Sequence, residues 1–199
     1  TTLTWAQLFA NGWVQQGGSG NETLIGHAGT DELRGGAGND TLDGGDGSNR
    51  LFGEAGDDVL RTDTGSSNNN VLAGGTGNDT LNGSYKSDTY LFNLGDGVDS
   101  IVETGSHTGA VDVLRFGEGI KLEDLQFQRS GVDLVIAHAN GVDKVVLKNA
   151  LTSTTVMATW GSTTLIEKVE FADGTTLTWA QLFANGWVQQ GGSGNETLI

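Results

Sequence analysis

The chain has 199 residues, of which 33 are glycine and none is proline or cysteine, and its formal net charge is −15. The lack of cysteine excludes disulfides and thiolate metal sites, and the lack of a three-residue glycine period excludes a collagen-like chain. The charge disfavours nucleic acid and anionic membranes as partners, because both require clustered Lys and Arg. Membrane insertion is not expected either, because no apolar run approaches the roughly 18 residues of a membrane span.

A long repeat frames the chain. Residues 1–25, TTLTWAQLFANGWVQQGGSGNETLI, return unchanged as residues 175–199. We therefore expect one unit of a tandem array, with neighbouring identical modules as its partners. The expected division is 1–16 as the tail of a preceding module, 17–103 as a repeat domain, 104–190 as a β-rich capping and linking segment with a terminal helix, and 191–199 as the start of the next module.

A shorter repeat of nine residues runs from residue 17 to about residue 103. Typical rows are GGAGNDTLD at 35–43 and GGTGNDTLN at 74–82, and a twelve-residue version occupies 62–73. The eighth place is nearly always leucine: Leu24, Leu33, Leu42, Leu51, Leu60, Leu72, Leu81, Tyr90 and Ile101. The sixth place is Asp, Glu or Asn: Glu22, Asp31, Asp40, Asn49, Asp58, Asn70, Asp79, Asp88 and Asp99.

Each row predicts a three-residue strand with one inward side chain, joined to the next strand by a glycine-rich turn. Two strands and two turns close a coil of 18 residues, so stacked coils predict an all-β parallel solenoid with turns along two edges. One buried leucine contributes roughly 1.5–3 kcal/mol, whereas ordering nine backbone residues costs roughly 1–2 kcal/mol each. The apolar core alone is therefore insufficient.

The acidic column indicates what else stabilises the coils. Carboxylates on one edge would lie about 5 Å apart, the spacing of adjacent strands, and residues 17–103 contain 15 Asp and Glu against four Lys and Arg. Such a column requires a counter-charge. Calcium accepts six to eight oxygens from carboxylates and carbonyls, whereas magnesium demands tighter geometry and retains its waters. We therefore expect several Ca²⁺ ions in each module.

The rows GGAGNDTLD and GGTGNDTLN resemble the nonapeptide G-G-x-G-x-D-x-U-x of RTX (repeats-in-toxin) proteins. The resemblance implies a right-handed parallel β-roll in which each calcium lies between two turns of one edge. One turn supplies the carbonyls of its second and fourth residues and its sixth side chain. The turn 18 residues later supplies the carbonyls of its first and third residues and its sixth side chain.

Applied to this sequence, the resemblance implies five sets of calcium ligands. The sets are Gly18, Gly20 and Glu22 with Gly35, Ala37 and Asp40; His27, Gly29 and Asp31 with Gly44, Asp46 and Asn49; Gly36, Gly38 and Asp40 with Gly53, Ala55 and Asp58; Glu54, Gly56 and Asp58 with Gly74, Thr76 and Asp79; and Gly75, Gly77 and Asp79 with Leu94, Asp96 and Asp99. Asp88 is a further candidate ligand.

The two edges differ in charge. The first edge carries Glu22, Asp40, Asp58, Asp79 and Asp99, and the second edge carries Asp31, Asn49, Asn70 and Asp88. Because Asn brings no charge, we expect the first edge to bind calcium more tightly. The insertion in 62–73 and Lys86, which stands where glycine is usual, both weaken the second edge.

The second half of the chain shows alternating apolar residues. We expect strands over 111–116, 125–130, 132–138, 142–148 and 166–171, hairpin turns at 139–142 and 172–175, and a short helix over 177–186 with Thr178 as N-cap. The expected core residues are Val113, Leu114, Phe116, Leu125, Phe127, Leu134, Ile136, Val145, Leu147, Val169 and Phe171. This half resembles the haemolysin-type calcium-binding-related segment that follows RTX rolls, which implies a cap on the roll and no catalysis.

No catalytic constellation is recognisable, because the three histidines are scattered and GGSG is not the G-x-S-x-G elbow. We therefore expect no enzyme, although a longer parent chain could carry a catalytic domain elsewhere. The leading interpretation is a calcium-binding structural module of a large secreted bacterial protein, or of one at the cell surface. The resemblance implies type I secretion and folding on calcium outside the cell. The alternative is a calcium-dependent adhesion module that binds a glycan or a surface receptor. Five tryptophans could stack on such a ligand or serve as packing contacts: Trp5, Trp13, Trp160, Trp179 and Trp187.

Overall fold

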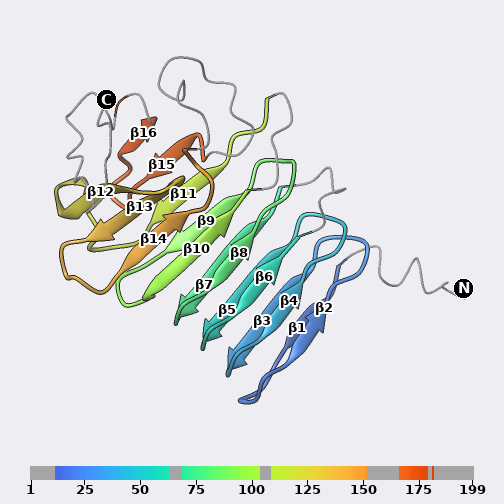
Figure 1. The fold of residues 1–199 in the computed structure, drawn as a ribbon. Helices are drawn as coiled ribbons and strands as arrows, with labels where there is room; N and C mark the ends of the chain where they lie inside the picture. Colours follow the sequence, from blue (N-terminus) through green and yellow to red (C-terminus); the bar gives the residue numbers. More distant parts are fainter. Residues whose placement is uncertain (1–11, 63–68, 104–108, 152–165, 179–180, 182–199) are drawn as a thin grey trace, which may run out of the picture.

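The computed structural model describes residues 12–62, 69–103, 109–151, 166–178 and 181, which form a β-solenoid of two eight-stranded sheets (Figure 1). The first sheet contains, in spatial order, β1 (Val14–Gln16), β3 (Glu32–Ala37), β5 (Arg50–Ala55), β7 (Val71–Thr76), β9 (Thr89–Phe92), β11 (Val113–Phe116), β15 (Lys168–Glu170) and β16 (Thr176–Thr178). The second sheet contains β2 (Thr23–Ile25), β4 (Thr41–Asp43), β6 (Val59–Arg61), β8 (Thr80–Asn82), β10 (Val98–Val102), β14 (Lys144–Leu147), β13 (Asp133–His138) and β12 (Leu125–Ser130).

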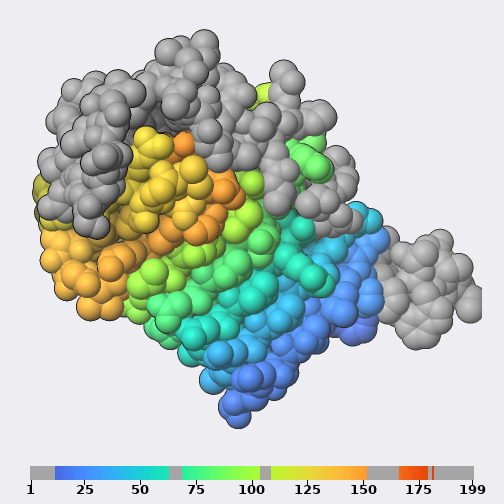
Figure 2. Space-filling view, viewed as in Figure 1, coloured from blue at the N-terminus to red at the C-terminus, as the bar shows by residue number. Residues whose placement is uncertain are grey.

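The chain alternates between the two sheets, so each coil contributes one strand to each, and the predicted parallel β-roll is confirmed. Leu33 pairs with Leu51 in the first sheet, and Leu42 pairs with Leu60 in the second. The three-residue insertion changes the spacing but not the register, because Leu51 then pairs with Leu72. The coils stack as successive bands along the molecule (Figure 2).

The core is the predicted eighth-place column. Its members from Leu33 to Ile101 are at most 2% exposed, and they form one apolar cluster with the core of the second half. Leu24, in the first coil, is only partly buried. Because each coil contributes two inward side chains, a leucine becomes fully buried only when a further coil lies on both of its sides.

Strand lengths differ between the sheets. Strands β2, β4, β6 and β8 have the predicted three residues, whereas β3, β5 and β7 have six and extend into the next turn. The extension arises because Gly36 pairs with Glu54 and Ala37 pairs with Ala55. The first three residues of a first-edge turn are therefore strand residues, and only the last three form the bend.

The second half continues both sheets and does not form a separate layer. Strand β11 pairs with β9 and β15, and β14 pairs with β10, all in parallel. The hairpins β13–β14 and β15–β16 turn at Gly141 and Gly174, which have the positive φ values expected of Asn-Gly and Asp-Gly turns. These antiparallel strands and β12 lie at the C-terminal end of the two sheets (Figure 1).

Most expected core residues of this half are buried, and Leu125 and Phe127 are partly buried against the core. Val113 is half-buried, because Leu114 and Phe116 are the inward residues of β11. Phe116 packs edge-on against Phe92 and stacks on Phe171, with ring centroids 6.1 and 5.5 Å away. These aromatic contacts join the roll to its cap.

The predicted helix over 177–186 begins too early, because Leu177 and Thr178 belong to β16. The backbone N–H of Thr178 donates to Gln181 Oε1 over 2.9 Å, and its hydroxyl lies 3.0 Å from the same atom, as at a helix N-terminus. The remainder of that helix lies outside the described residues. A short 3-10 turn, η1 (Leu122–Asp124), precedes β12.

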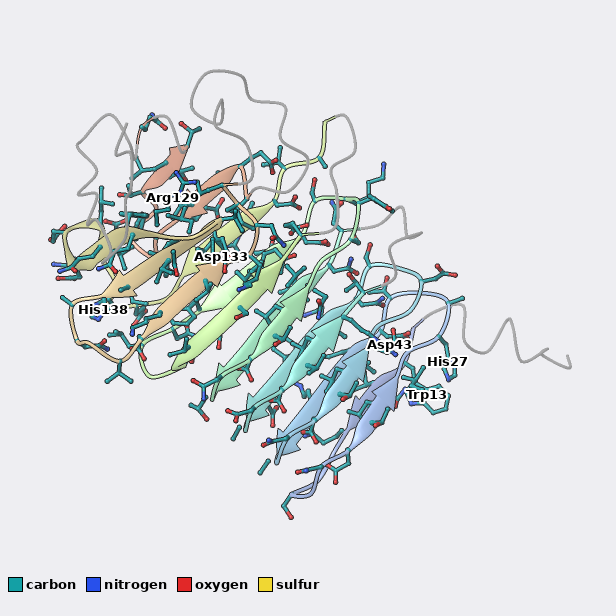
Figure 3. The ribbon with its side chains drawn as sticks, viewed as in Figure 1. Trp13, His27, Asp43, Arg129, Asp133 and His138 are labelled. Atoms are coloured by element: carbon teal, nitrogen blue, oxygen red, sulfur yellow. The ribbon has the colours of Figure 1, made fainter. Side chains whose placement is uncertain are left out.

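Trp13 is the one tryptophan among the described residues. It is 41% exposed and lies beside His27, with ring centroids 5.3 Å apart (Figure 3). Both residues belong to the N-terminal end of the roll. Within the described part of the chain, no helix has the length and apolarity required to cross a membrane.

Candidate metal centre

The charged residues of the roll fall into two groups. Arginines on the outer faces of the sheets pair with outer acids, as Arg61 does with Asp43 over 2.7 Å and Arg34 with Glu32 over 2.8 Å. Among the described residues, no ion pair involves an acidic residue of the sixth place. The described residues therefore supply no counter-charge to the column of acids.

On the first edge, one oxygen of each sixth-place carboxylate is held by the backbone. Oδ1 of Asp40, Asp58 and Asp79 accepts the N–H of the sixth residue in the preceding turn over 2.7 Å, and Oδ1 of Asp99 does so over 3.1 Å. All four side chains are 1% exposed. These hydrogen bonds fix the carboxylates in one orientation, at one per coil.

The other oxygen of the same carboxylates has no partner. Oδ2 of Asp40, Asp58, Asp79 and Asp99 is buried and makes no hydrogen bond. Leaving such an atom unpaired costs considerable free energy. A regular column of four of them indicates a ligand that the polypeptide itself does not supply.

The first glycine of each row makes room for this oxygen. A Cβ on Gly35 would lie 2.3 Å from Asp40 Oδ2, and one on Gly53 would lie 2.2 Å from Asp58 Oδ2. The carboxylate therefore lies directly over the glycine of its own turn. Glycine in this place is a consequence of the position of the acid.

Backbone carbonyls converge on the same turns. A Cβ on Gly36 would lie 2.3 Å from the carbonyl oxygen of Gly18, and one on Gly38 would lie 2.1 Å from that of Gly20. Both glycines have positive φ. Glu54, a non-glycine in the second place, also adopts φ 77°, so this turn keeps the same backbone form.

The carbonyl oxygens expected as third-place ligands accept backbone hydrogen bonds in the structure. The carbonyl oxygens of Ala55, Thr76 and Asp96 each accept an N–H from the preceding turn over 2.8 Å. A carbonyl oxygen has a second lone pair, so this hydrogen bond leaves one position on each oxygen for a cation. The expected first-edge ligands thus lie together in successive turns, and their role as ligands stays a prediction.

Burial makes the ionised carboxylates unfavourable. Desolvation raises the pKa of Asp58 from its ordinary value of 3.8 to about 6, with Asp40 as a repelling neighbour. Desolvation likewise raises the pKa of Asp79 to about 7 and that of Asp99 to about 8, and in each case the preceding acid adds repulsion. Without a cation, these raised pKa values keep Asp99 mainly protonated at neutral pH and leave Asp79 near its midpoint, whereas a bound divalent ion favours the ionised form.

The second edge is built differently at Asn49. Its amide Nδ2 lies 2.9, 3.2 and 3.3 Å from the carbonyl oxygens of Gly44, Gly45 and Asp46. Gly44 and Asp46 are two of the expected calcium ligands. The Asn49 amide therefore makes the contacts with these carbonyl oxygens that the resemblance assigns to the metal. In this turn a side-chain N–H group takes the place of a cation.

The remaining second-edge residues also have partners. Asp31 Oδ2 accepts the N–H of His27 over 2.6 Å. Asp88 Oδ2 accepts the N–H of Ser84 over 2.7 Å, and Asn70 Nδ2 donates to Asp88 Oδ1 over 2.9 Å. No sixth-place oxygen of Asp31, Asn49, Asn70 or Asp88 is among the orphaned atoms of the described chain.

Two acidic residues that the sequence did not identify extend the second edge. Asp112 Oδ1 accepts the N–H of Asp88 over 2.8 Å, so Asp112 continues the sixth-place column. Its signal is the spacing of Asp112 and Leu114, which matches that of Asp58 and Leu60. The separation of 24 positions between Asp88 and Asp112, in place of the usual 18, hides this signal in the sequence.

Glu103 was also missed. It is 7% exposed and accepts a short hydrogen bond from the Tyr90 hydroxyl. Desolvation raises the pKa of Glu103 well above its ordinary range and the pKa of Asp112 to about 7. Glu103, Asp88 and Asp112 form a group whose oxygens lie within 4.8 Å of one another.

The first edge ends at Asp143, where the cap begins. Its carboxylate accepts the N–H of Gly95 over 2.9 Å and that of Gly97 over 3.2 Å, and these donors contribute to lowering its pKa against its burial. In the next strand of the sheet, β14, the residue paired with Asp99 is Val145, which is buried and apolar. The column of orphaned oxygens therefore stops at Asp99.

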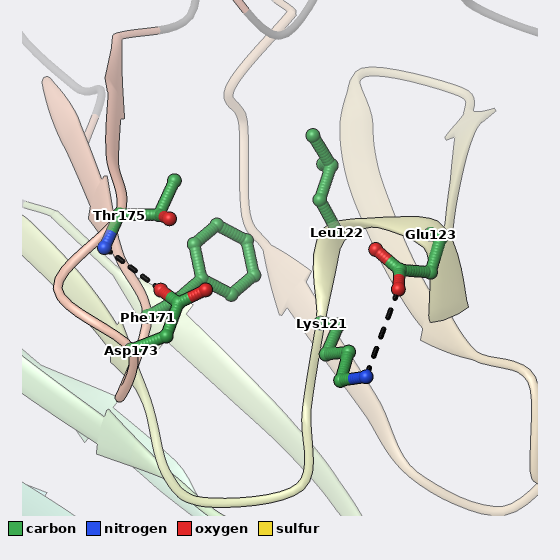
Figure 4. A pocket seen from close by; sticks show the side chains of 6 residues that line it. All are labelled: Lys121, Leu122, Glu123, Phe171, Asp173 and Thr175. Carbon is green, nitrogen blue, oxygen red and sulfur yellow. Dashed lines mark hydrogen bonds and ion pairs between the residues drawn. The ribbon is translucent and has the colours of Figure 1, made fainter.

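A pocket in the cap lies between η1 and the β15–β16 hairpin (Figure 4). Its lining residues are Lys121, Leu122, Glu123, Phe171, Asp173 and Thr175. Lys121 pairs with Glu123 over 3.9 Å, and Asp173 accepts the N–H of Thr175 within the hairpin turn over 2.8 Å. These contacts stabilise the local turns.

Among solved structures, the chain resembles the extracellular lipase LipA from Serratia marcescens, with a TM-score of 0.37 and 20% identity. The match covers 68% of this chain and 36% of the lipase, so the chain spans little more than a third of the lipase's length. No curated protein matches the chain.

Two known families match the sequence directly. The RTX calcium-binding nonapeptide repeat matches residues 16–51, 35–67 and 64–101, and the haemolysin-type calcium binding protein related domain matches residues 133–181. These ranges coincide with the roll that carries the acidic columns and with the cap. Residues 16–101 therefore belong to the RTX calcium-binding repeats, and residues 133–181 belong to the haemolysin-type calcium binding protein related domain.

Proposed function

We propose that this chain is a structural module that folds outside the cell when calcium enters the turns of the first edge. The observation that supports it is the column of buried Oδ2 atoms, on Asp40, Asp58, Asp79 and Asp99, that make no hydrogen bond. Each lies in a turn where carbonyl oxygens converge. Carboxylate and carbonyl oxygens are the ligands that calcium prefers.

Calcium would supply the missing counter-charge between successive turns. Asp58, for example, would contribute to the ion below it and to the ion above it, because each sixth-place acid stands between two neighbouring turns. Binding of this kind couples the coils, so ordering one turn favours ordering the next. We therefore expect calcium-dependent folding to be cooperative along the roll.

Extracellular folding follows from charge and from calcium supply. The chain carries −15, and its acidic segment repels itself when no cation is bound. Calcium is scarce in the cytosol and abundant outside the cell, so an unfolded chain could be exported by type I secretion and fold on arrival. Copies joined in tandem would form a stiff spacer, and the module's role would be structural and not catalytic.

The test is a far-UV circular dichroism titration of the full chain, started in chelator. Calcium should produce a steep gain of β signal, whereas magnesium at the same concentration should produce little. A chain that is fully folded in chelator and indifferent to calcium would contradict the proposal. A response of equal size to magnesium would show that charge screening, and not calcium coordination, drives folding.

A further inference from the structure

We propose that Asp88, Glu103 and Asp112 form a calcium site of a second kind, on the second edge where the roll meets its cap. This site would bind the ion through three side-chain carboxylates and not through the carbonyls of two nonapeptide turns. The proposal adds a separate site to the calcium-dependent function proposed above. It does not depend on any first-edge residue.

The geometry of the three acids suits one cation. Each contributes one oxygen, and the three oxygens lie within 4.8 Å of one another. Two ligands that each lie about 2.4 Å from one ion are at most about 4.8 Å apart, so this spacing meets the condition for a shared calcium ion. The side chains of Asp88, Glu103 and Asp112 are 0%, 7% and 1% exposed, so the ion would be enclosed.

The fold brings these residues together from three strands. Asp88 directly precedes β9, Asp112 directly precedes β11, and Glu103 directly follows β10. Strands β9 and β11 are paired neighbours in the first sheet, and β10 ends in the second. An ion here would connect the last nonapeptide coil to the first coil of the cap.

A second observation, separate from the spacing of the three acids, is that one carboxylate oxygen of Glu103 lacks a partner. Its Oε1 accepts the Tyr90 hydroxyl, whereas its Oε2 is buried and has no hydrogen-bond partner. Glu103 follows β10 as Gly83 follows β8, and the absence of a side chain at Gly83 leaves room for it. A Cβ on Gly83 would lie 2.8 Å from Glu103 Oε1 and 1.9 Å from the Tyr90 hydroxyl.

Tyr90 and Glu103 are linked exceptions to the repeat. Tyr90 stands in the leucine column, fully buried, and its hydroxyl reaches from the core to Glu103. The other two acids are fixed by backbone donors: Asn70 and Ser84 donate to Asp88, and Asp88 donates to Asp112. Ligand carboxylates that are held by such hydrogen bonds are typical of metal sites.

Within the described part of the chain, no cationic side chain balances this group. Among the described residues, no ion pair involves Asp88, Glu103 or Asp112. Three ionised carboxylates buried together require a counter-charge or protons. A divalent ion and a shared proton are therefore the two explanations that an experiment must separate.

The experiment counts calcium ions bound to the full chain, by native mass spectrometry and by isothermal titration calorimetry. Glu103→Gln keeps the size of the side chain and an acceptor for Tyr90 but removes the charge. We expect this variant to bind one calcium fewer than the wild type. The matched control is Glu123→Gln, which changes an exposed acid of the cap and should leave the number unchanged.

The outcomes distinguish this proposal from the first one. A wild type that binds no calcium contradicts the proposed function, whereas a wild type and a Glu103→Gln variant with equal numbers of ions overturn only this site. Greater stability of Glu103→Gln in chelator, with an unchanged ion count, would identify Glu103 as a protonated core group. If the variant does not fold, crystals of the wild type grown in calcium must show an anomalous peak between the three carboxylates, and its absence overturns the site.

Discussion

Exchanging Asp58 and Asn49, the sixth-place residues of one turn on each edge, tests the proposal that the first-edge turns require calcium and that the Asn49 turn does not. Asp58→Asn gives a first-edge turn the amide that Asn49 has on the second edge. Asn49 Nδ2 contacts three carbonyl oxygens of its own turn. The variant therefore loses an orphaned buried oxygen and gains a donor directed at carbonyls.

The expected gain can be worked out from the pKa of Asp58. Burial raises this pKa from 3.8 to about 6, so the ionised side chain destabilises the calcium-free fold by about 3 kcal/mol at pH values above 6. The penalty is absent below about pH 3.8 and grows as pH rises through this interval. In chelator at alkaline pH, Asp58→Asn should therefore stabilise the roll by up to about 3 kcal/mol.

In saturating calcium the sign reverses, because Asp58 would serve the ions on both sides of its turn. Asp58→Asn should then be less stable than the wild type and should bind fewer ions. Asn49→Asp should behave in the opposite way in chelator, since it replaces an amide donor with a buried carboxylate oxygen that faces the carbonyl oxygens of its own turn.

Urea denaturation followed by far-UV circular dichroism, in chelator and in calcium, measures both effects. Asp43→Asn is the matched control, because it removes one acid from an outer face where Arg61 pairs with it. Its effect should stay below about 1 kcal/mol in both conditions. Equal destabilisation by Asp58→Asn with and without calcium would refute the reasoning.

Three other perturbations test the remaining parts of the structure. In chelator the chain should lose stability as pH rises from about 4 to 8, because burial raises the pKa of Asp79 to about 7 and of Asp99 to about 8. Denaturation midpoints measured across this pH range give the loss of stability. Calcium should abolish the loss. Gly77→Ala places a Cβ 2.1 Å from a carbonyl oxygen of the preceding turn and should weaken the calcium response. Gly131 also has positive φ, but a Cβ there meets nothing within 4 Å, so Gly131→Ala should cost only about 1 kcal/mol of backbone strain. Calcium titrations of the two variants compare these effects. Leu60→Ala removes a side chain with 0% exposure and should cost about 2–5 kcal/mol in calcium, by urea denaturation.

Each of these expectations has a contrary result. A flat stability profile in chelator would show that the buried acids carry no pH-dependent penalty. Equal calcium responses in the two glycine variants would show that calcium does not bind at the converging carbonyl oxygens of the first-edge turns. A loss well below 2 kcal/mol for Leu60→Ala would mean that the leucine column does not carry the core.

The roll was predictable because each feature repeats at short range. The buried leucines and the stacked acids follow from the nine-residue period, and the two hairpins follow from Asn140-Gly141 and Asp173-Gly174. Asp112 was missed because an expanded coil interrupts the period that identifies the other acids. Glu103 was missed because its contact with Tyr90 depends on which strands lie side by side.

Tighter calcium binding at the first edge stays a prediction, and the structure adds a physical reason for it that the sequence does not contain. The sequence indicates that Asn49 brings no charge, which favours weaker calcium binding. Only the side-chain geometry shows that the Asn49 amide contacts the carbonyls of its own turn. The lengths of β3, β5 and β7 likewise depend on pairing between coils, as at Gly36 and Glu54, and not on the residues of one row.

The most direct test of calcium between the first-edge turns is a crystal structure grown in calcium, with anomalous scattering data. We predict ions about 2.3–2.6 Å from Oδ2 of Asp40, Asp58, Asp79 and Asp99, and none in the Asn49 turn. Ordered first-edge turns with no ion at these oxygens, or equal occupancy of both edges, would contradict it.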